Sequence, residues 1–381
     1  MGLMETTATA DEIFRFGLRV GDVLITKDSE EWSDIAVPSL VVESAPDLVC
    51  GYHLATIRPK HDVLSARFLL RAMQASAVNQ QFQMAATGVT RYGLPKSSIG
   101  EAWLPLPPPD EQRAIAAFLD RETAKIDTLV AKKQELIERL KEKRTALISR
   151  TVTRGLPPDA ARAAGLEPHP KLKPSGIEWL GDVPNHWVIL PLKWRARCAS
   201  GDGISTEVVS ALAEEDALTP VIGGNGLMGY TSRANVQQRV VVIGRVGALC
   251  GNVHEVDPPA WVTDNALILD ADDRTFDSIY LAAVLRSRNL NEIAERTAQP
   301  LITGSQVRDQ RLPRPPLEEQ QSIVAFLKHE MSKIDKMVAK VETAIERLQE
   351  YRTALITATV TGKIDVRDQT HDNRRQPASI S

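Results

Sequence analysis

Several features that mark common protein classes are scarce in these 381 residues. No apolar run reaches the roughly 18 residues that a membrane-spanning helix requires, and the polar segment 1–11 lacks the apolar centre of a signal peptide. The three cysteines, Cys50, Cys198 and Cys250, are far apart in the sequence and form no C-x-x-C pair, which favours a reducing compartment without structural zinc. We therefore expect a cytoplasmic protein whose segment 1–11 is disordered.

Charge of one sign is also lacking, because the formal net charge is only −3. Contacts with a polyanion such as DNA would then depend on local basic patches or on a larger complex. Aromatic residues make up 5% of the chain. The length and composition are those of a protein with about two globular domains.

Motifs with catalytic chemistry are missing as well. No His, Cys or Asp spacing is typical of a metal site, and no Ser-His-acid arrangement can be identified. Residues 257–261, DPPAW, resemble the D-P-P-aromatic motif of adenine methyltransferases, but Ala260 is inserted and no glycine-rich cofactor loop precedes the motif. Residues 222–230, IGGNGLMGY, could bind a phosphate through backbone N–H groups, but no Lys-Ser/Thr follows as in a Walker loop, so a hairpin turn is the favoured interpretation. We expect no catalytic residues, metal ligands or cofactor in this chain.

What the sequence does contain is a long internal repeat. Residues 104–153 and 312–361 align without a gap at an offset of 208, and about 30 of the 50 aligned residues are identical. Both copies contain the pattern P-P-x-x-E-Q, then helical spacing, then R-T-A-L-I and T-V-T. The period exceeds that of solenoid repeats, so it indicates the duplication of a domain together with a long helix.

Each copy predicts one long helix. The prolines at 105–109 end just before Asp110, which can cap a helix. Apolar residues then recur at steps of three, four or seven, the spacing of a coiled-coil seam. About 40 residues at 1.5 Å each give a helix of roughly 60 Å. The two helices can pack antiparallel about a pseudo-twofold axis, with a domain at each end. The predicted seam residues are Ile115, Leu119, Ile126, Val130, Ile137, Leu140 and Leu147 in the first copy and Ile323, Leu327, Ile334, Val338, Val341, Ile345, Leu348 and Leu355 in the second.

The expected fold is therefore α/β, with mixed helices and strands in two globular domains separated by two long antiparallel coiled-coil helices. Short strands are expected at 20–26, 53–57, 220–224, 239–245 and 265–270, and domain helices at 65–83, near 97 and at 277–288. The expected boundaries are 1–108 for the first domain, 109–154 for the first long helix, 155–174 for a proline-rich linker, 175–316 for the second domain, 317–362 for the second long helix and 363–381 for a disordered tail.

The domains that precede the two long helices differ in length. If residues 23–26 are aligned with 240–243, the second domain has about 60 preceding residues and the first about 20. The first copy then has no counterpart of Trp179, Trp187 or the Gly223–Gly226 turn, so we expect the first domain to lack its opening third.

Polar and basic residues in loops are the candidates for nucleic-acid contact. Arg and Lys can bind phosphates, and Arg, Asn and Gln can recognise base edges. Solvated loops are the alternative. The candidates are Arg91, Tyr92, Lys96, Asn225, Tyr230, Arg245, Ser305, Gln306 and Arg308.

The doubled P-P-x-x-E-Q helix, together with SGIEWLGDVPNHW at 175–187, resembles the specificity subunit of type I restriction-modification systems. This resemblance covers nearly the whole chain, and the short first domain departs from it. It implies a non-enzymatic DNA-binding subunit whose two target-recognition domains bind the halves of a bipartite site. It also implies that the long helices set the spacer length and dock methyltransferase subunits. The implied partners are double-stranded DNA, two methyltransferase subunits and motor-nuclease subunits.

By the same resemblance, S-adenosylmethionine, ATP and Mg would be bound by those partner subunits. The residues carried over as scaffold and docking residues are Glu111, Gln112, Phe118, Ile126, Arg144 and Leu147, matched by Glu319, Gln320, Phe326, Ile334, Arg352 and Leu355. The alternatives are a coiled-coil adaptor that does not bind DNA specifically, a non-functional remnant of a specificity subunit, and a self-sufficient methyltransferase, which the missing cofactor loop disfavours.

Overall fold

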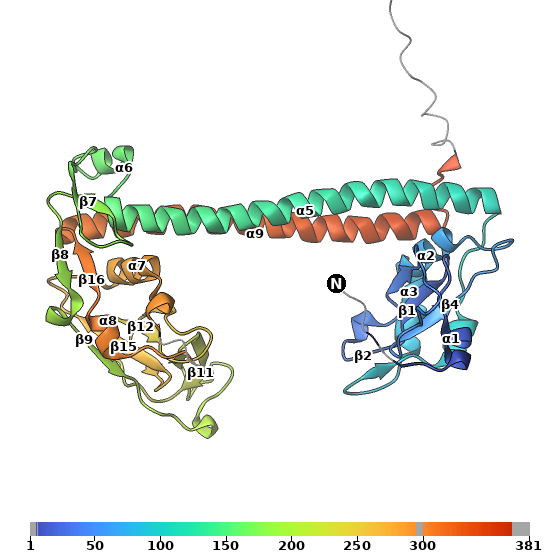
Figure 1. Ribbon diagram of the computed structural model, residues 1–381, viewed down its shortest axis with the longest axis horizontal. Helices are drawn as coiled ribbons and strands as arrows, with labels where there is room; N and C mark the ends of the chain where they lie inside the picture. The colour runs from blue at the N-terminus through green and yellow to red at the C-terminus, as the bar shows by residue number, and fades with distance from the viewer. Residues whose placement is uncertain (1–4, 6, 295–299, 368–381) are drawn as a thin grey trace, which may run out of the picture. The chain divides into compact units, whose positions relative to one another are not determined.

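The computed structural model describes Glu5, residues 7–294 and residues 300–367. The chain forms two compact units: unit 1 contains residues 1–136 and 340–381, and unit 2 contains residues 137–339. The boundary passes through both long helices, α5 (Pro109–Arg154) and α9 (Leu317–Val360), which Figure 1 shows in green and red. Each unit therefore contains one part of each long helix and one α/β domain.

Unit 1 has a small antiparallel sheet with strand order β3-β1-β4. Helix α2 packs on this sheet, and its apolar face buries Phe68, Leu69 and Met73. The elements of its domain are α1 (Ala10–Phe16), β1 (Val23–Thr26), β2 (Asp28–Ser29), a 3-10 turn η1 (Trp32–Asp34), β3 (Pro38–Leu40), β4 (Leu54–Ile57), α2 (Ala66–Gln74), α3 (Ser76–Ala85), β5 (Tyr92–Gly93) and α4 (Lys96–Glu101).

Two predictions for unit 1 were wrong. The single helix expected at 65–83 is two helices, because Ala75 has an extended backbone and the chain turns between α2 and α3. Part of the segment expected to be disordered forms the start of α1. Thr9 caps this helix, and its hydroxyl accepts from the backbone N–H of Glu12 while the Glu12 carboxylate accepts from Thr9.

Unit 2 contains a larger domain built from several small sheets. Its elements are α6 (Pro158–Ala163), β6 (Leu172–Pro174), β7 (Asp182–Pro184), β8 (Val188–Pro191), η2 (Leu192–Trp194), β9 (Ala196–Ser200), η3 (Thr206–Val208), β10 (Thr219–Gly223), β11 (Gly226–Thr231), β12 (Val240–Gly244), β13 (Val253–Val256), β14 (Trp261–Val262), β15 (Ala266–Ala271), α7 (Ser278–Arg288), η4 (Leu290–Ile293), α8 (Gly304–Arg308) and β16 (Arg311–Arg314).

The central sheet of unit 2 is antiparallel with strand order β13-β12-β15-β9. Helix α7 packs on β12 and β13, and its residues from Tyr280 to Leu285 are buried. A second sheet has the order β11-β10-β14, in which β10 and β14 are parallel. The predicted hairpin turn in IGGNGLMGY is confirmed, since β10 and β11 pair antiparallel around it and Gly226 has a φ of +101°.

The segment expected to be a linker is folded. Helix α6 buries Ala161, and strand β6 pairs antiparallel with β7. Leu156 and Ala161 belong to the same core cluster as Trp187 and Tyr280. The prolines in this stretch therefore limit the length of its elements without preventing them from packing. In unit 1, likewise, Val366 lies in the core although it falls in the expected tail; residues 368–381 of that tail lie outside the described residues.

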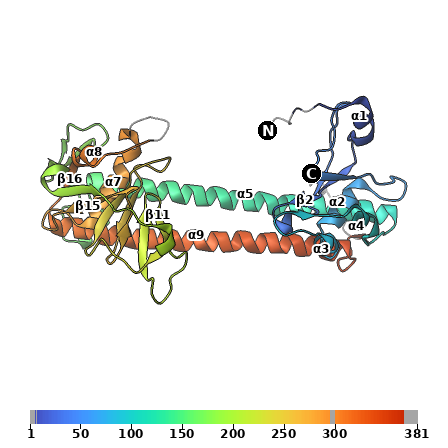
Figure 2. The ribbon, with the colours of Figure 1, turned by 90° about the horizontal axis from the view of Figure 1, so that it is seen from below.

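Within each unit the two long helices run antiparallel. In unit 1, Ile115 and Leu119 near the start of α5 share a core cluster with Ile356 and Val360 near the end of α9. In unit 2, Val152 near the end of α5 shares a cluster with Ile323 near the start of α9. The paired stretches lie side by side in each unit (Figures 1 and 2). Because the seam residues of both helices are packed in these shared clusters, both copies need apolar residues at the same spacing.

Candidate nucleic-acid interface

Each domain is anchored to the start of its own long helix by a buried glutamine. The amide oxygen of Gln112 accepts from the backbone N–H of Ser65, and its Nε2 donates to the carbonyls of Val63 and Pro107, at 2.8 to 2.9 Å. These bonds hold the first turn of α2 against α5. Gln112 is 1% exposed, so its polar groups must be satisfied within the protein.

Gln320 makes the equivalent contacts in unit 2. Its oxygen accepts from the N–H of Asp277, which caps α7, and its Nε2 donates to the carbonyls of Thr275 and Pro315, at 2.9 to 3.0 Å. Gln of the P-P-x-x-E-Q pattern therefore has one structural role in both copies. The sequence identified both residues, but it assigned them to partner docking as well as to the scaffold.

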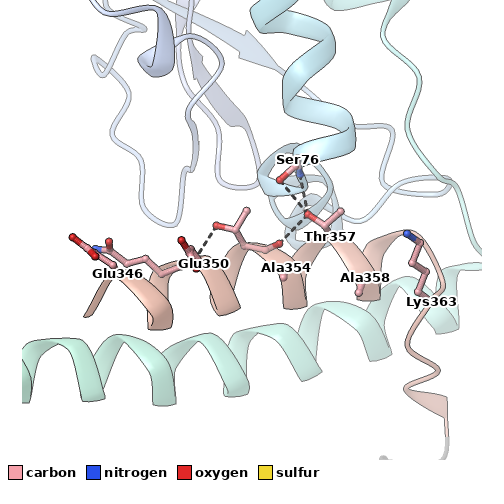
Figure 3. A pocket seen from close by; sticks show the side chains of 9 residues that line it. Ser76, Glu346, Glu350, Ala354, Thr357, Ala358 and Lys363 are labelled. Atoms are coloured by element: carbon pink, nitrogen blue, oxygen red, sulfur yellow. Dashed lines mark hydrogen bonds between the residues drawn. The ribbon is translucent and has the colours of Figure 1, made fainter. Parts of the chain in front are cut away.

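Each domain is also attached to the last turns of the other copy's long helix. In unit 1 the Thr357 hydroxyl on α9 accepts from the backbone N–H of Ser76 at 3.0 Å, and the two hydroxyls are 3.4 Å apart (Figure 3). In unit 2 the hydroxyls of Ser287 and Ser149 are hydrogen-bonded at 2.9 Å. Thr357 and Ser149 are 208 residues apart. Each domain is thus held at two points, one on each long helix.

A surface hollow lies beside each of these second attachments. The hollow in unit 1 has a volume of about 790 Å³ and is bordered by Ser76, Thr357 and the acidic Glu346 and Glu350 of α9 (Figure 3). The hollow in unit 2 has a volume of about 550 Å³. It includes Ser149 and the basic side chains Arg150, Arg154 and His169. The two hollows occupy equivalent places on the long helices and differ in charge.

In unit 1, Arg91 lies in a group of charged and aromatic side chains that we call the unit 1 surface: Lys27, Asp28, Tyr52, His53 and Arg91. Nε and Nη2 of Arg91 lie 3.2 and 3.0 Å from Oδ1 of Asp28, and Nδ1 of His53 contacts the same oxygen. Nζ of Lys27 lies 4.4 Å from the centroid of the Tyr52 ring, and Tyr52 is 80% exposed.

The Asp28 carboxylate orients the side chains of Arg91 and His53 in the unit 1 surface. Burial alone would raise the pKa of Asp28, but the hydrogen bonds from His53 and Arg91 outweigh it and lower the pKa below its ordinary value. Asp28 therefore stays ionised at neutral pH. The exposed ring of Tyr52 can stack on a base, and Lys27 and Arg91 can bind phosphate or base edges.

Only Arg91 of these five residues was identified from the sequence. Asp28 is 63 residues from Arg91 along the chain, and strand pairing between β2 and β5 brings the two together. Tyr52 and His53 could have been identified from the sequence by one feature: an aromatic residue lies next to a histidine at the start of the predicted strand. Two neighbouring candidates lie elsewhere: Tyr92 packs partly against the core, and the exposed Lys96 begins α4.

In unit 2, Asn225 and Arg245 lie at the end of β12 that Gly244 forms, whereas Ser305–Arg308 belong to α8, which packs on β9 and η2; we call these residues together the unit 2 surface. Nη1 of Arg245 donates to the Ser200 hydroxyl at 3.1 Å. The carbonyl of Arg245 accepts from the N–H of Ile302, just before α8. Asn225 is exposed in the β10–β11 turn, and the adjacent Gly224 backbone lies against Gly244. A side chain at Gly224 would collide with the Asn265 carbonyl.

The candidates on α8 and β11 have surroundings that differ from those of Arg245. The Gln306 amide oxygen accepts from the Thr303 N–H and hydroxyl, and its Nε2 donates to the Ile293 carbonyl, so its polar atoms are engaged in capping α8. Ser305 and Arg308 are exposed. Tyr230 lies near the far end of β11 from Asn225, where it pairs with Pro220. Contact of these residues with DNA stays a prediction.

The residues predicted for the scaffold and for docking lie mostly in the helix pair. Ile126, Ile334 and Leu355 are buried, Leu147, Phe118 and Phe326 are half-buried, and Arg144 and Arg352 pair with Asp335 and Asp127. Glu319 is 6% exposed and accepts from Nε1 of Trp187 at 3.0 Å and from Nε2 of His186 at 2.8 Å. Its counterpart Glu111 is half-buried.

In the part of the chain that the structure describes, no group of His, Cys, Asp and Glu residues is arranged to hold a metal ion. Within the same residues, no helix is long and apolar enough to cross a membrane. In the DPPAW segment the indole N–H of Trp261 donates to the Asp202 carbonyl, and Asp257 accepts from Arg239. Burial raises the pKa of the Cys198 thiol to about 12, which keeps it protonated.

Two α/β domains, each anchored to both long helices and each with exposed cationic loops, define a duplicated binding protein. The family model described as the type I restriction modification DNA specificity domain matches the chain twice, at residues 19–139 and 209–347. These matches cover more than half of the chain, so the chain belongs to the family of type I restriction-modification DNA specificity domains. Specificity subunits of this family are non-catalytic DNA-recognition components of restriction-modification complexes.

Known proteins agree with this assignment. The specificity subunit of the EcoprrI type I restriction enzyme of Escherichia coli is 30% identical over 128 residues, 34% of this chain and 32% of that protein, so the match spans about a third of that relative. The specificity subunit assigned to the MjaX type I restriction enzyme of Methanocaldococcus jannaschii is 21% identical over 372 residues, 94% of this chain and 81% of that protein.

A solved structure has the same fold. It comes from work on complex assembly and conformational transition of the type I restriction-modification system, and it is 18% identical with a TM-score of 0.64. The match covers 91% of this chain and 83% of that chain. The prediction of a mixed α/β fold with two domains and two long helices is confirmed.

Proposed function

We propose that the chain recognises a bipartite DNA target, one half-site through the domain of each unit, and that it positions methyltransferase and motor-nuclease subunits on that DNA. The observation that carries this proposal is the duplicated anchoring of the two domains. Gln112 and Gln320 make the same three hydrogen bonds, and Thr357 and Ser149 hold the domains at equivalent helix positions. The two domains are anchored in the same way but differ in sequence. This combination is suited to the recognition of two different half-sites.

The unit 1 and unit 2 surfaces are the proposed places of DNA contact. Lys27 and Arg91 in unit 1 and Arg245 in unit 2 supply cations next to strand ends, and Arg308 supplies one at the end of α8. Phosphate contacts would give affinity, and contacts of Tyr52, Asn225 or the arginines with bases would give specificity. Binding should weaken strongly as the salt concentration rises, because each neutralised phosphate releases counterions.

The two hollows are the proposed docking places for partner subunits. Their equivalent positions beside Thr357 and Ser149 favour one partner subunit at each hollow, and because the hollows differ in charge, the two partner contacts would not be identical. S-adenosylmethionine, ATP and Mg would be bound by the methyltransferase and motor-nuclease subunits, and this chain would supply no cofactor ligands. The target adenine would then be flipped into the methyltransferase subunit.

The test uses the chain assembled with the methyltransferase subunits that are encoded with it. Methylation mapping in a host that carries all the genes identifies the modified sequence, and duplexes with that sequence are then used in binding assays. Lengthening the spacer by one base pair rotates one half-site by roughly 34° and moves it by roughly 3.4 Å. We expect at least tenfold weaker binding. A change outside the target is the control.

Equal affinity for every spacer length would contradict recognition of two half-sites at a fixed separation. Equal affinity for unrelated duplexes at low and high salt would instead support the coiled-coil adaptor that does not bind DNA specifically. Modification at one half-site sequence only would show that a single domain recognises DNA.

A further inference from the structure

In unit 2 the turn between β10 and β11 is supported by the central sheet. Nε2 of His254 on β13 donates to the carbonyl of Gly224 at 3.4 Å, and a Cβ at Gly226 would lie 3.4 Å from Cε1 of the same ring. Asn225, between these two glycines, is exposed, and among the described residues none is hydrogen-bonded to its side-chain amide. The turn therefore has a fixed position and presents an amide that is available for binding.

Two apolar side chains beside this turn are exposed as well. Ile222 on β10 lies opposite Leu227 on β11, and the register then shifts so that Met228 is the extra residue of a β-bulge. Successive residues of a regular strand point to opposite faces, but Leu227 and Met228 are both exposed, at 58% and 61%. The Met228 side chain lies over Gly223, where an added Cβ would collide with its sulfur. The hairpin thus presents one amide and two apolar side chains to solvent.

Charge is distributed unevenly along the hairpin. Arg245 lies beside the turn, where its backbone N–H is next to Gly224, and its guanidinium is hydrogen-bonded to a serine hydroxyl. At the other end of the hairpin Ser210 pairs with Tyr230, and the Ser210 hydroxyl donates to the Glu214 carboxylate at 2.9 Å. The cation is therefore near the turn and the carboxylate near the base, so the turn is the end that is suited to approach a polyanion.

We propose that the β10–β11 hairpin enters the major groove of DNA and recognises an A·T base pair, through Asn225 and the apolar side chains of Leu227 and Met228. In that groove adenine presents an acceptor and a donor that an asparagine amide matches, and thymine presents a methyl group that an apolar side chain contacts. A two-stranded β-ribbon fits this groove, which is about 12 Å wide. The inference rests on the proposed recognition of DNA and assigns one base pair of the unit 2 half-site to named residues.

The test uses the chain assembled with its methyltransferase subunits and a duplex that contains the methylated target. Deoxyuridine replaces each thymine of the target in turn, which removes the methyl group and keeps the base pairing. We expect one position at which the wild type binds about fourfold more weakly, the effect of losing one methyl group from an apolar contact. At that position the double variant Leu227→Ala, Met228→Ala should bind thymine and deoxyuridine equally.

A matched control and a second variant complete the experiment. Leu212 is 75% exposed and precedes β10, so Leu212→Ala should keep the fourfold difference between thymine and deoxyuridine. Asn225→Ala should reduce the preference for A·T over G·C by roughly tenfold or more at the same position. Circular dichroism identical to that of the wild type shows that each variant is folded.

The outcomes separate this inference from the proposed function. If the wild type binds its target specifically but no deoxyuridine weakens binding, or if the weakening persists in the double variant, the hairpin assignment is wrong while DNA recognition stands. Absence of sequence-specific binding overturns both. Methyltransferase subunits that protect the amides of Leu227 and Met228 from hydrogen exchange without DNA would make a protein the occupant of the hairpin, which also overturns the assignment.

Discussion

Arg352 on α9 donates through Nε to Oδ1 of Asp127 on α5, over 3.0 Å, within unit 1. The residues at an offset of 208, Arg144 and Asp335, form an ion pair within unit 2. In one pair the arginine comes from the second copy of the repeat and the aspartate from the first, and in the other pair the copies are exchanged. Such reciprocal pairing requires an antiparallel arrangement, so the same Arg and Asp positions mark the register of the helices in both units.

Reversing one charge of the unit 1 pair should destabilise that unit, and reversing both should restore it. Arg352→Asp places two carboxylates together. The side chains of Arg352 and Asp127 are 29% and 57% exposed, so we expect a cost of about 1 kcal/mol or less. Adding Asp127→Arg should recover most of the loss in a thermal unfolding experiment. Lys132→Asp on the exposed flank is the control, and a double variant no more stable than the sum of the single changes would contradict the pairing.

Replacing the buried glutamines should have a larger effect. Gln320→Leu leaves the N–H of Asp277 and the carbonyls of Thr275 and Pro315 without their partner. Buried unpaired polar groups cost about 1–3 kcal/mol each, partly relieved by water. We expect a loss of about 2–4 kcal/mol in the urea unfolding of unit 2, and a similar loss in unit 1 for Gln112→Leu. The control Gln134→Leu, on the exposed surface of α5, should change the stability little. If Gln320→Leu lowered the stability no more than this control, the anchoring role would be contradicted.

The sequence predicted the long helices well because their information is local and repeated. Apolar residues at steps of three, four and seven, preceded by prolines and Asp110, are sufficient to place a helix. The break between α2 and α3 was not predictable in this way. It occurs where the N–H of Ser76 bonds Thr357, a residue of α9 that is 281 positions away. A tertiary contact, not local preference, decides the chain direction there.

The candidate site was less predictable than the fold for the same reason. Arg91 could be chosen by residue type, but its orientation depends on Asp28 and His53, which only the strand pairing brings near it. Gln306 was predicted to contact a base because Arg, Asn and Gln can recognise base edges, whereas its amide caps α8. Residue type alone does not distinguish a capping amide from an exposed one.

Unit 1 should lose stability in acid through Asp22. This carboxylate, 1% exposed, accepts from Nε and Nη2 of Arg58 at 2.7 and 2.6 Å and from the Arg19 N–H. Burial would raise the pKa of Asp22, but these hydrogen bonds lower it overall. Because the folded pKa lies below the unfolded value of about 3.9, the stabilisation is complete above that value and is lost as the pH falls through the folded pKa.

Hydrogen exchange of β1 measures this effect within unit 1. Between pH 6 and pH 3, we expect the protection of β1 in the wild type, corrected for intrinsic exchange, to fall more steeply than in Asp22→Asn, which has no titrating group there. Asp22→Asn should be less protected at pH 6. Asp62→Asn, on the exposed surface, is the control and should follow the wild type. Parallel pH profiles for Asp22→Asn and the wild type would contradict the assignment.

Arg91 and Arg245 should each affect one half-site of the DNA target and leave the other unchanged. Arg91 is oriented by Asp28 in unit 1 and Arg245 by Ser200 in unit 2. If the guanidinium contacts a base edge, replacement by alanine costs about 1–3 kcal/mol and relaxes the preference at one position. If it contacts a phosphate, binding weakens uniformly and the salt dependence falls by about one counterion. Competition among duplexes mutated in one half-site separates these outcomes. Arg233→Ala, at an exposed position of unit 2, is the control, and unchanged preference and salt dependence would exclude the tested arginine from the interface.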